Sequence, residues 1–104
     1  MAGLGKFLKQ AQKMQEQMQR AQDELAAREV EGSAGGGAVK AVARCDGSVI
    51  SIKIDPKVVD AKDVEMLEDL VLGAVTNALE VAKKTQSDEM AKVTAGFNLP
   101  GVTQ

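Results

Sequence analysis

The sequence predicts a single α+β domain over residues 1–104 whose elements follow the order α-β-β-β-α. Three observations support this fold class. Apolar residues with heptad spacing run through the first quarter of the chain, alternating apolar and polar residues flank an Asp-Gly pair near its middle, and a wider apolar stripe follows between residues 64 and 82. A chain of 104 residues is long enough for one domain with a modest core.

The first helix is predicted to run from Leu4 to about Arg28. Its apolar residues are separated alternately by three and four positions, which is the spacing of a helix that packs along a partner helix. Glutamine, a good helix former, fills much of its polar surface. The apolar series consists of Leu4, Phe7, Ala11, Met14, Met18, Ala21 and Leu25.

A β-hairpin is predicted around Asp46-Gly47, because an Asp-Gly pair is typical of a two-residue type I′ turn. This turn fixes the register and sorts both strands into a core face and a solvent face. The expected core-face pairs are Ala43 with Ile50, Ala41 with Ile52, and Val39 with Ile54. The expected solvent-face pairs are Lys40 with Lys53, Val42 with Ser51, and Arg44 with Val49.

A further strand, from about Arg28 to Ala34, is predicted to join this hairpin through a turn at Gly35-Gly36, giving a three-stranded antiparallel sheet. The expected pairs are Val30 with Ala41 on the core face and Glu31 with Lys40 on the other. The glycines could also suggest a phosphate-binding loop, but neither a Lys-Ser/Thr pair nor a helix start follows them, so we favour the hairpin.

The second helix is predicted to begin at Ala61 with Asp60 as its N-cap and Asp63 near the capping-box position, because Asp55-Pro56 ends the last strand. We expect it to run to about Val93, with possible fraying at 85–87, and residues 94–104 to form a flexible tail. Its stripe is wide enough to cover the sheet. The stripe consists of Val64, Leu67, Leu70, Val71, Ala74, Val75, Ala78, Leu79 and Ala82.

The composition argues against catalysis, metal binding and membrane insertion. The chain has no histidine, which is the commonest general base and metal ligand, and its one cysteine, Cys45, lacks a partner. Neither a membrane-length apolar run nor a secretory signal is apparent, so we expect a cytoplasmic protein. We therefore expect no enzyme activity, no cofactor, no metal and no small-molecule substrate. Phe7 and Phe97 are its only aromatic residues, so a nucleic-acid partner would be held as a duplex rather than by base stacking.

The formal charge of −2 is distributed unevenly. Residues 1–22 carry four basic side chains and one acidic, whereas the rest of the chain carries nine basic and fourteen acidic. Lys6, Lys13 and Arg20 recur every seven residues and Lys9 is one turn from Lys6, so the four form a stripe beside the apolar seam. Such a stripe can contact DNA phosphates. Alternatively, it keeps the helix soluble.

Two further basic groups have competing interpretations. Lys83, Lys84 and Lys92 could contact DNA, but cations near a helix C-terminus also complement the helix dipole. Lys40 and Lys53, expected opposite each other, could mark an anion site. We favour a salt-bridge row there, because Glu31 is expected beside Lys40.

The first helix would leave an apolar seam uncovered if the second helix covers the sheet. Exposed apolar patches of this size usually mark interfaces, so the seam predicts a homodimer. The expected interface residues are Phe7, Ala11, Met14, Met18, Ala21 and Leu25.

Five segments, in order along the whole chain, resemble the YbaB/EbfC family of nucleoid-associated proteins. They are Lys9 to Gln22, Gly32 to Gly37, Ile52 to Pro56, Glu65 to Leu70, and Leu99 to Gly101. The resemblance implies an intertwined homodimer whose helices project from a central sheet around duplex DNA. It also implies roles in nucleoid organisation, gene regulation and DNA protection. The alternatives are an adaptor for recombination or replication proteins and an RNA-binding module.

Overall fold

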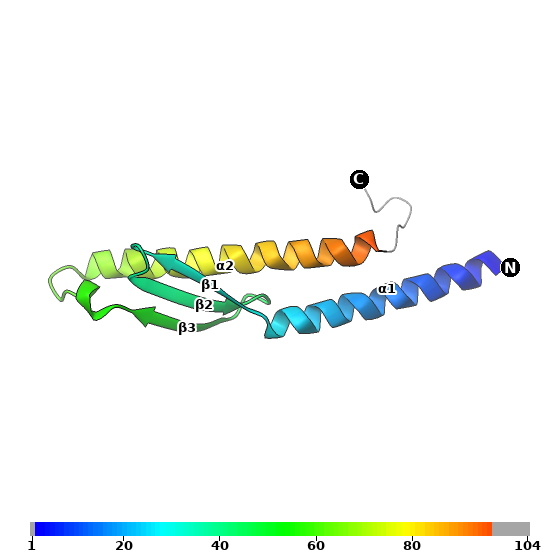
Figure 1. Ribbon diagram of the computed structural model, residues 1–104, viewed down its shortest axis with the longest axis horizontal. Helices are drawn as coiled ribbons and strands as arrows, with labels where there is room; N and C mark the ends of the chain where they lie inside the picture. Colours follow the sequence, from blue (N-terminus) through cyan, green and yellow to red (C-terminus); the bar gives the residue numbers. More distant parts are fainter. Residues whose placement is uncertain (1, 97–104) are drawn as a thin grey trace.

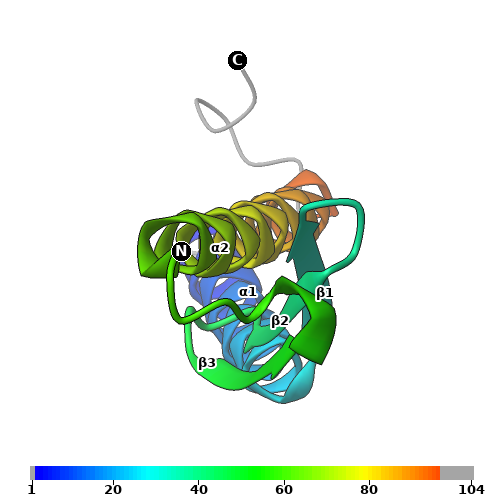
Figure 2. The same ribbon diagram turned by 90° about the vertical axis from the view of Figure 1, so that its left-hand side faces the viewer.

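The computed structural model describes residues 2–96 and confirms the α-β-β-β-α order (Figure 1). The strands form one antiparallel sheet in the order β1-β2-β3. Figure 2 shows α2 lying along one face of this sheet. The tail was predicted over residues 94–104; Thr94 and Ala95 belong to α2 instead, and residues 97–104 lie outside the described residues. The elements are α1 (Ala2–Ala27), β1 (Glu29–Ala34), β2 (Val39–Arg44), β3 (Val49–Ile54), the 3-10 turn η1 (Pro56–Val58) and α2 (Val64–Ala95).

Helix α2 packs directly on β1 at Gly32. A Cβ at this position would overlap the backbone nitrogen of Ala78 and lie 2.7 Å from the carbonyl oxygen of Ala74. Glycine is therefore required here because the helix backbone approaches the strand without an intervening side chain. The fully buried core is correspondingly thin and consists of Val39, Ala41, Ala43, Ala74 and Ala78.

The predicted register between β1 and β2 is wrong by two residues. Gly35, Gly36 and Gly37 all have positive φ, and the amide of Ala38 donates to the carbonyl of Gly35, so the connection is a four-residue loop rather than a two-residue turn. The observed pairs are therefore Val30 with Ala43, Glu31 with Val42, and Ser33 with Lys40. Glu31 is not opposite Lys40.

The register between β2 and β3 is confirmed away from the turn and wrong next to it. Val39 pairs with Ile54, Ala41 with Ile52, Lys40 with Lys53 and Val42 with Ser51, as predicted, but Ala43 pairs with Val49 instead of Ile50. The amide of Gly47 donates to the carbonyl of Arg44, and the amide of Arg44 donates to the carbonyl of Ser48, so the loop has three residues and Arg44 is not opposite Val49. A bulge on β3 then restores the expected register.

The prediction that the second helix covers the sheet holds for β1 and β2 but not for β3. Ile50, Ile52 and Ile54 are 39%, 43% and 38% exposed, whereas Ala41 and Val39, the β2 partners of Ile52 and Ile54, are buried. At the opposite edge, the side chain of Asn77 on α2 accepts a hydrogen bond of 3.0 Å from the amide of Ser33. The β1 edge is thus partly protected by α2, and the β3 edge is open.

The second helix begins three residues later than predicted. Asp63, not Asp60, is the N-cap, and its carboxylate accepts a hydrogen bond of 3.2 Å from the amide of Met66. Asp60 instead accepts from the amide of Lys62 and shapes the preceding turn. The helix continues without a break through residues 85–87 and ends at Ala95.

The seam of α1 is not wholly uncovered, because α1 contacts the part of α2 that extends beyond the sheet. Leu25 is 3% exposed within the single chain. Exposure then increases toward the N-terminus: Met14, Met18 and Ala21 are half-buried, whereas Phe7 is 55% exposed. Cys45, at the turn between β2 and β3, is buried.

The close approach at Gly32 predicts a large effect of one methyl group. Gly32→Ala should destabilise the protein by about 2–3 kcal/mol, because either the strand or the helix must move to admit the Cβ. Chemical denaturation with circular dichroism detection measures this change. Gly5→Ala is the matched control, since nothing lies within 4 Å of a Cβ there, and it should stabilise α1 by about 0.5–1 kcal/mol. Equal stability of the two variants would contradict the proposed role of Gly32.

Candidate nucleic-acid interface

The four basic residues of α1 lie on an exposed stripe. Lys6, Lys13 and Arg20 recur every seven residues, and Lys9 lies one turn beyond Lys6. At a helical rise of 1.5 Å per residue the stripe is about 21 Å long. All four side chains belong to exposed residues, and the ion pairs that the structure shows between residues 2 and 96 include none of them. Their charges are therefore available to an anionic partner.

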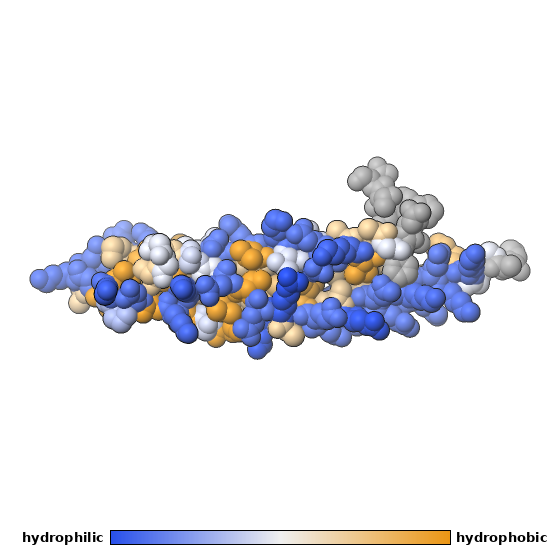
Figure 3. Space-filling model, in the orientation of Figure 1, coloured by the Kyte–Doolittle hydropathy of each residue, from blue (hydrophilic) through white to orange (hydrophobic). Residues whose placement is uncertain are grey.

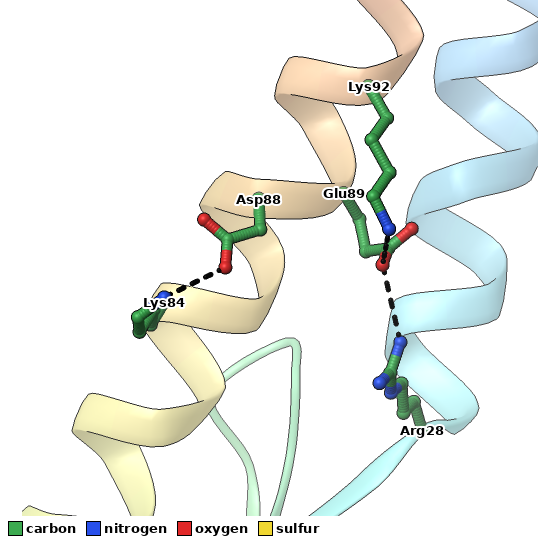
Figure 4. A network of polar contacts seen from close by, with 5 residues as sticks. All are labelled: Arg28, Lys84, Asp88, Glu89 and Lys92. Atoms are coloured by element: carbon green, nitrogen blue, oxygen red, sulfur yellow. Dashed lines mark hydrogen bonds and ion pairs between the residues drawn. The ribbon is translucent and has the colours of Figure 1, made fainter.

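Two of the three candidate lysines on α2 are engaged in ion pairs. Lys84 contacts Asp88 at 3.0 Å, and Lys92 contacts Glu89 at 3.2 Å (Figure 4). The two lysine side chains remain 78% and 73% exposed, so water screens these contacts and they contribute little stability. Lys83 is exposed and takes part in none of the ion pairs found within residues 2–96. The cations of α2 are thus partly neutralised, unlike those of α1.

Arg28 is a basic residue near the helices that no sequence pattern singled out. It follows the last residue of α1, and its guanidinium lies 3.5 Å from the carboxylate of Glu89 on α2. Figure 4 shows Arg28, Glu89 and Lys92 between the two helices, while Lys84 and Asp88 lie on the other side of α2. Residues 28 and 89 are far apart in the sequence, so no local pattern indicates this contact. It links the base of α1 to α2.

The open face of the sheet carries a further pair of lysines. Lys40 and Lys53 are directly opposite each other on β2 and β3, and Ser33 is opposite Lys40 on β1. All three residues are exposed, because α2 lies on the other face. The expected salt-bridge row with Glu31 is absent from the ion pairs of residues 2–96, since the register places Glu31 opposite Val42.

The acidic residues of the described chain show no arrangement for metal binding. Between residues 2 and 96, no group of three or more His, Cys, Asp or Glu side chains is placed to hold a metal ion. The pKa of Asp46 is lowered, because its carboxylate accepts hydrogen bonds from the side chain and the amide of Ser48, but these bonds close the β2–β3 turn. Over the same residues no helix has an apolar stretch long enough to span a bilayer.

The exposed basic stripe of α1 can contact the phosphates of a nucleic acid, and comparison with known proteins agrees with such a partner. The model of the YbaB/EbfC DNA-binding family matches residues 1–97, and the chain belongs to this family. A nucleoid-associated protein of Caldanaerobacter subterraneus subsp. tengcongensis is 52% identical over 95% of this chain and 89% of its own length. Nucleoid-associated proteins of Pelotomaculum thermopropionicum and Nocardia farcinica are each 48% identical, over 95% and 92% of this chain and 94% and 87% of their own lengths.

A solved structure confirms the fold independently. The crystal structure of an uncharacterized protein from Helicobacter pylori superposes with a TM-score of 0.72, covering 90% of this chain and 96% of that one. The two sequences are only 15% identical, so this similarity concerns the fold alone.

Proposed function

We propose that this protein binds duplex DNA in the bacterial cytoplasm as a nucleoid-associated protein. In this role it would alter DNA conformation with loose sequence preference and contribute to nucleoid organisation, gene regulation and DNA protection. The observation that carries the proposal is the exposed basic stripe of α1, whose four charges lack acidic partners among residues 2–96, in a member of a DNA-binding family. The names of its relatives, nucleoid-associated proteins, support the nucleoid assignment.

The stripe supports binding to phosphates rather than to bases. Lysine and arginine side chains that contact phosphates release condensed counterions, and this gain does not depend on the base sequence. Sequence-independent binding of single strands usually relies on stacked aromatic side chains, and the two aromatic residues here, Phe7 and Phe97, are too few for such a platform. A duplex is therefore the better partner for this surface.

A second copy of the chain is the other partner that we propose. The molecule measures 74 × 25 × 16 Å and has a radius of gyration of 20.0 Å, whereas a compact chain of this length has about 13 Å. Among residues 2–96 only eight hydrophobic residues are buried, and five of them are alanines. A homodimer would bury more apolar surface than one chain can bury alone.

Two exposed apolar surfaces support this dimer. The first is the outer part of the α1 seam. Phe7 there is 55% exposed, and the seam continues through Ala11, Met14, Met18 and Ala21. Leu25 is already buried within the chain and adds little new contact area. The second surface lies where α2 leaves β3 uncovered. It consists of Ile52, Ile54 and a shallow apolar groove along α2 at Leu67, Val71, Leu72 and Val75. Figure 3 shows hydrophobic side chains reaching the surface along the body of the molecule.

DNA binding should depend on salt and on the α1 stripe. If about four to six phosphates are contacted, log K should fall against log salt with a slope of roughly −4 to −5. Replacing Lys9 and Lys13 together by alanine should weaken binding to all sequences and flatten this slope by about 2, while leaving the helix intact. Fluorescence anisotropy with labelled duplexes over a salt series measures both quantities.

The matched control for this experiment removes two other exposed lysines. Lys57 and Lys62 lie in η1 and in the turn before α2, away from α1, and their double alanine variant should bind nearly as the parent does. Binding of the parent that ignores salt would contradict the DNA proposal and favour a protein adaptor. Tighter binding to structured RNA than to duplex DNA would favour an RNA-binding module.

Dimerisation should be visible as a species of twice the chain mass of 10.9 kDa in sedimentation equilibrium at micromolar concentration. Phe7→Asp and Ile52→Asp test the two surfaces separately, because a carboxylate buried without a partner opposes association. Both side chains are exposed in the single chain, so the substitutions should leave its fold intact. A folded monomer for the parent protein would refute the dimer, and a variant that still dimerises excludes its surface from the interface.

A further inference from the structure

We infer that Lys40 and Lys53, on the open face of the sheet, form a second contact for the phosphates of duplex DNA, separate from the α1 stripe. This inference rests on the proposed function, since it assumes that the protein binds duplex DNA. From the sequence, Lys40 was expected beside Glu31 in a row of salt bridges. The observed register does not place Glu31 opposite Lys40.

The register places the two lysines side by side. Lys40 and Lys53 are directly opposite each other in adjacent antiparallel strands, and side chains so placed have Cβ atoms about 4.5–5.5 Å apart. Like charges directly opposite each other on adjacent strands are unfavourable. Between residues 2 and 96, the ion pairs of the structure involve Arg28, Lys84 and Lys92 with Asp88 and Glu89, and leave Lys40 and Lys53 unneutralised.

The four-residue loop between β1 and β2 moves Glu31 from the position opposite Lys40 to a diagonal position on the same face, where it forms no ion pair with Lys40. A two-residue turn would place Glu31 opposite Lys40, but the observed register places Ser33 there and moves Glu31 opposite Val42. The row across the sheet therefore reads serine, lysine, lysine, with a hydroxyl group and two ammonium groups on one face. Hydroxyl and ammonium groups are common donors to phosphate oxygens.

The surroundings leave this row accessible to a large, stiff polyanion. Helix α2 lies on the opposite face of the sheet, and α1 extends away from its end (Figures 1 and 2). The adjoining loop has no bulky side chain: a Cβ at Gly36 would meet nothing within 4 Å, and one at Gly37 would meet only the side chain of Lys40, at 3.8 Å. The positive φ values of this loop favour glycine. Because glycine has no side chain, a phosphate backbone can approach Lys40 without obstruction.

Removal of both charges tests the inference. The double variant Lys40→Gln with Lys53→Gln should bind duplex DNA more weakly. At about 0.1 M salt, each phosphate contact that is lost should weaken binding by about fivefold or more and should flatten the slope of log K against log salt by about 1. The same variant should unfold at an equal or higher temperature than the parent, because a like-charge pair is removed. Lys57→Gln with Lys62→Gln, which removes two exposed charges outside the sheet, is the control for general electrostatics.

Chemical protection tests the same inference on the unaltered protein. Acetylation of lysines, quantified by mass spectrometry with and without a short duplex, should show Lys40 and Lys53 protected by DNA and Lys57 and Lys62 unchanged. Equal acetylation of Lys40 and Lys53 in both states, or a double variant whose binding and slope match the control, would overturn the inference. If the inference fails in this way but replacement of Lys9 and Lys13 still abolishes DNA binding, the proposed function remains supported. A parent protein that does not bind duplex DNA would refute both the proposed function and this inference.

Discussion

The contact between Gly32 and the backbone of α2 determines how the rest of the chain packs. Because no side chain separates strand from helix at this point, the layer between them is thin enough to be filled by Ala74 and Ala78 against three small or β-branched residues of β2. Larger side chains of α2, such as Leu70 and Leu79, fit only at the flanks of the contact and stay half-buried. The helix is thereby held over β1 and β2, and β3 remains uncovered.

The lengths of the elements explain the elongated shape and the position of α1. Each strand has six residues and is about 20 Å long, whereas α2 has 32 residues and is about 48 Å long. The helix is therefore longer than the sheet: Leu70 packs at Gly35 at one end of the sheet, Ala82 lies beside Cys45 at the other, and α1 contacts the part of α2 that follows, at Glu89. Leu25 fills the start of that contact and Arg28 joins it through Glu89, whereas the N-terminal part of α1 extends past the end of α2 (Figure 1). The exposure gradient along the seam is thus a consequence of how far α2 extends along α1.

The sequence was sufficient for the element order, for both helices and for most of the β2–β3 register, because these depend on local periodicity. It was insufficient where the outcome depends on loop conformation or tertiary contact. Three consecutive glycines permit several turns, and the four-residue loop shifts β1 by two residues, which moves Glu31 away from Lys40. The alternation of β3 indicates an apolar face correctly, but only three-dimensional packing reveals that α2 does not reach it. The α1 stripe follows from spacing alone, whereas Arg28 could not have been selected because its partner is 61 positions away.

The net charge of −2 is compatible with DNA binding because the acidic and basic residues have different structural roles. Several acidic residues have local explanations: Asp55, Asp60 and Asp63 accept backbone hydrogen bonds at turns and at the N-cap of α2, and Glu65 in its first turn complements the helix dipole. The basic residues of α1 and of the open sheet face have no such partner among residues 2–96. Counterion release depends on the cations that reach the phosphates, and screening confines the acidic charges to about 10 Å. Since α2 and the open sheet face lie on opposite sides of the sheet (Figure 2), the acidic start of α2 does not stand between Lys40, Lys53 and an approaching duplex, and the acidic side chains of β1 on the open face are those of Glu29 and Glu31.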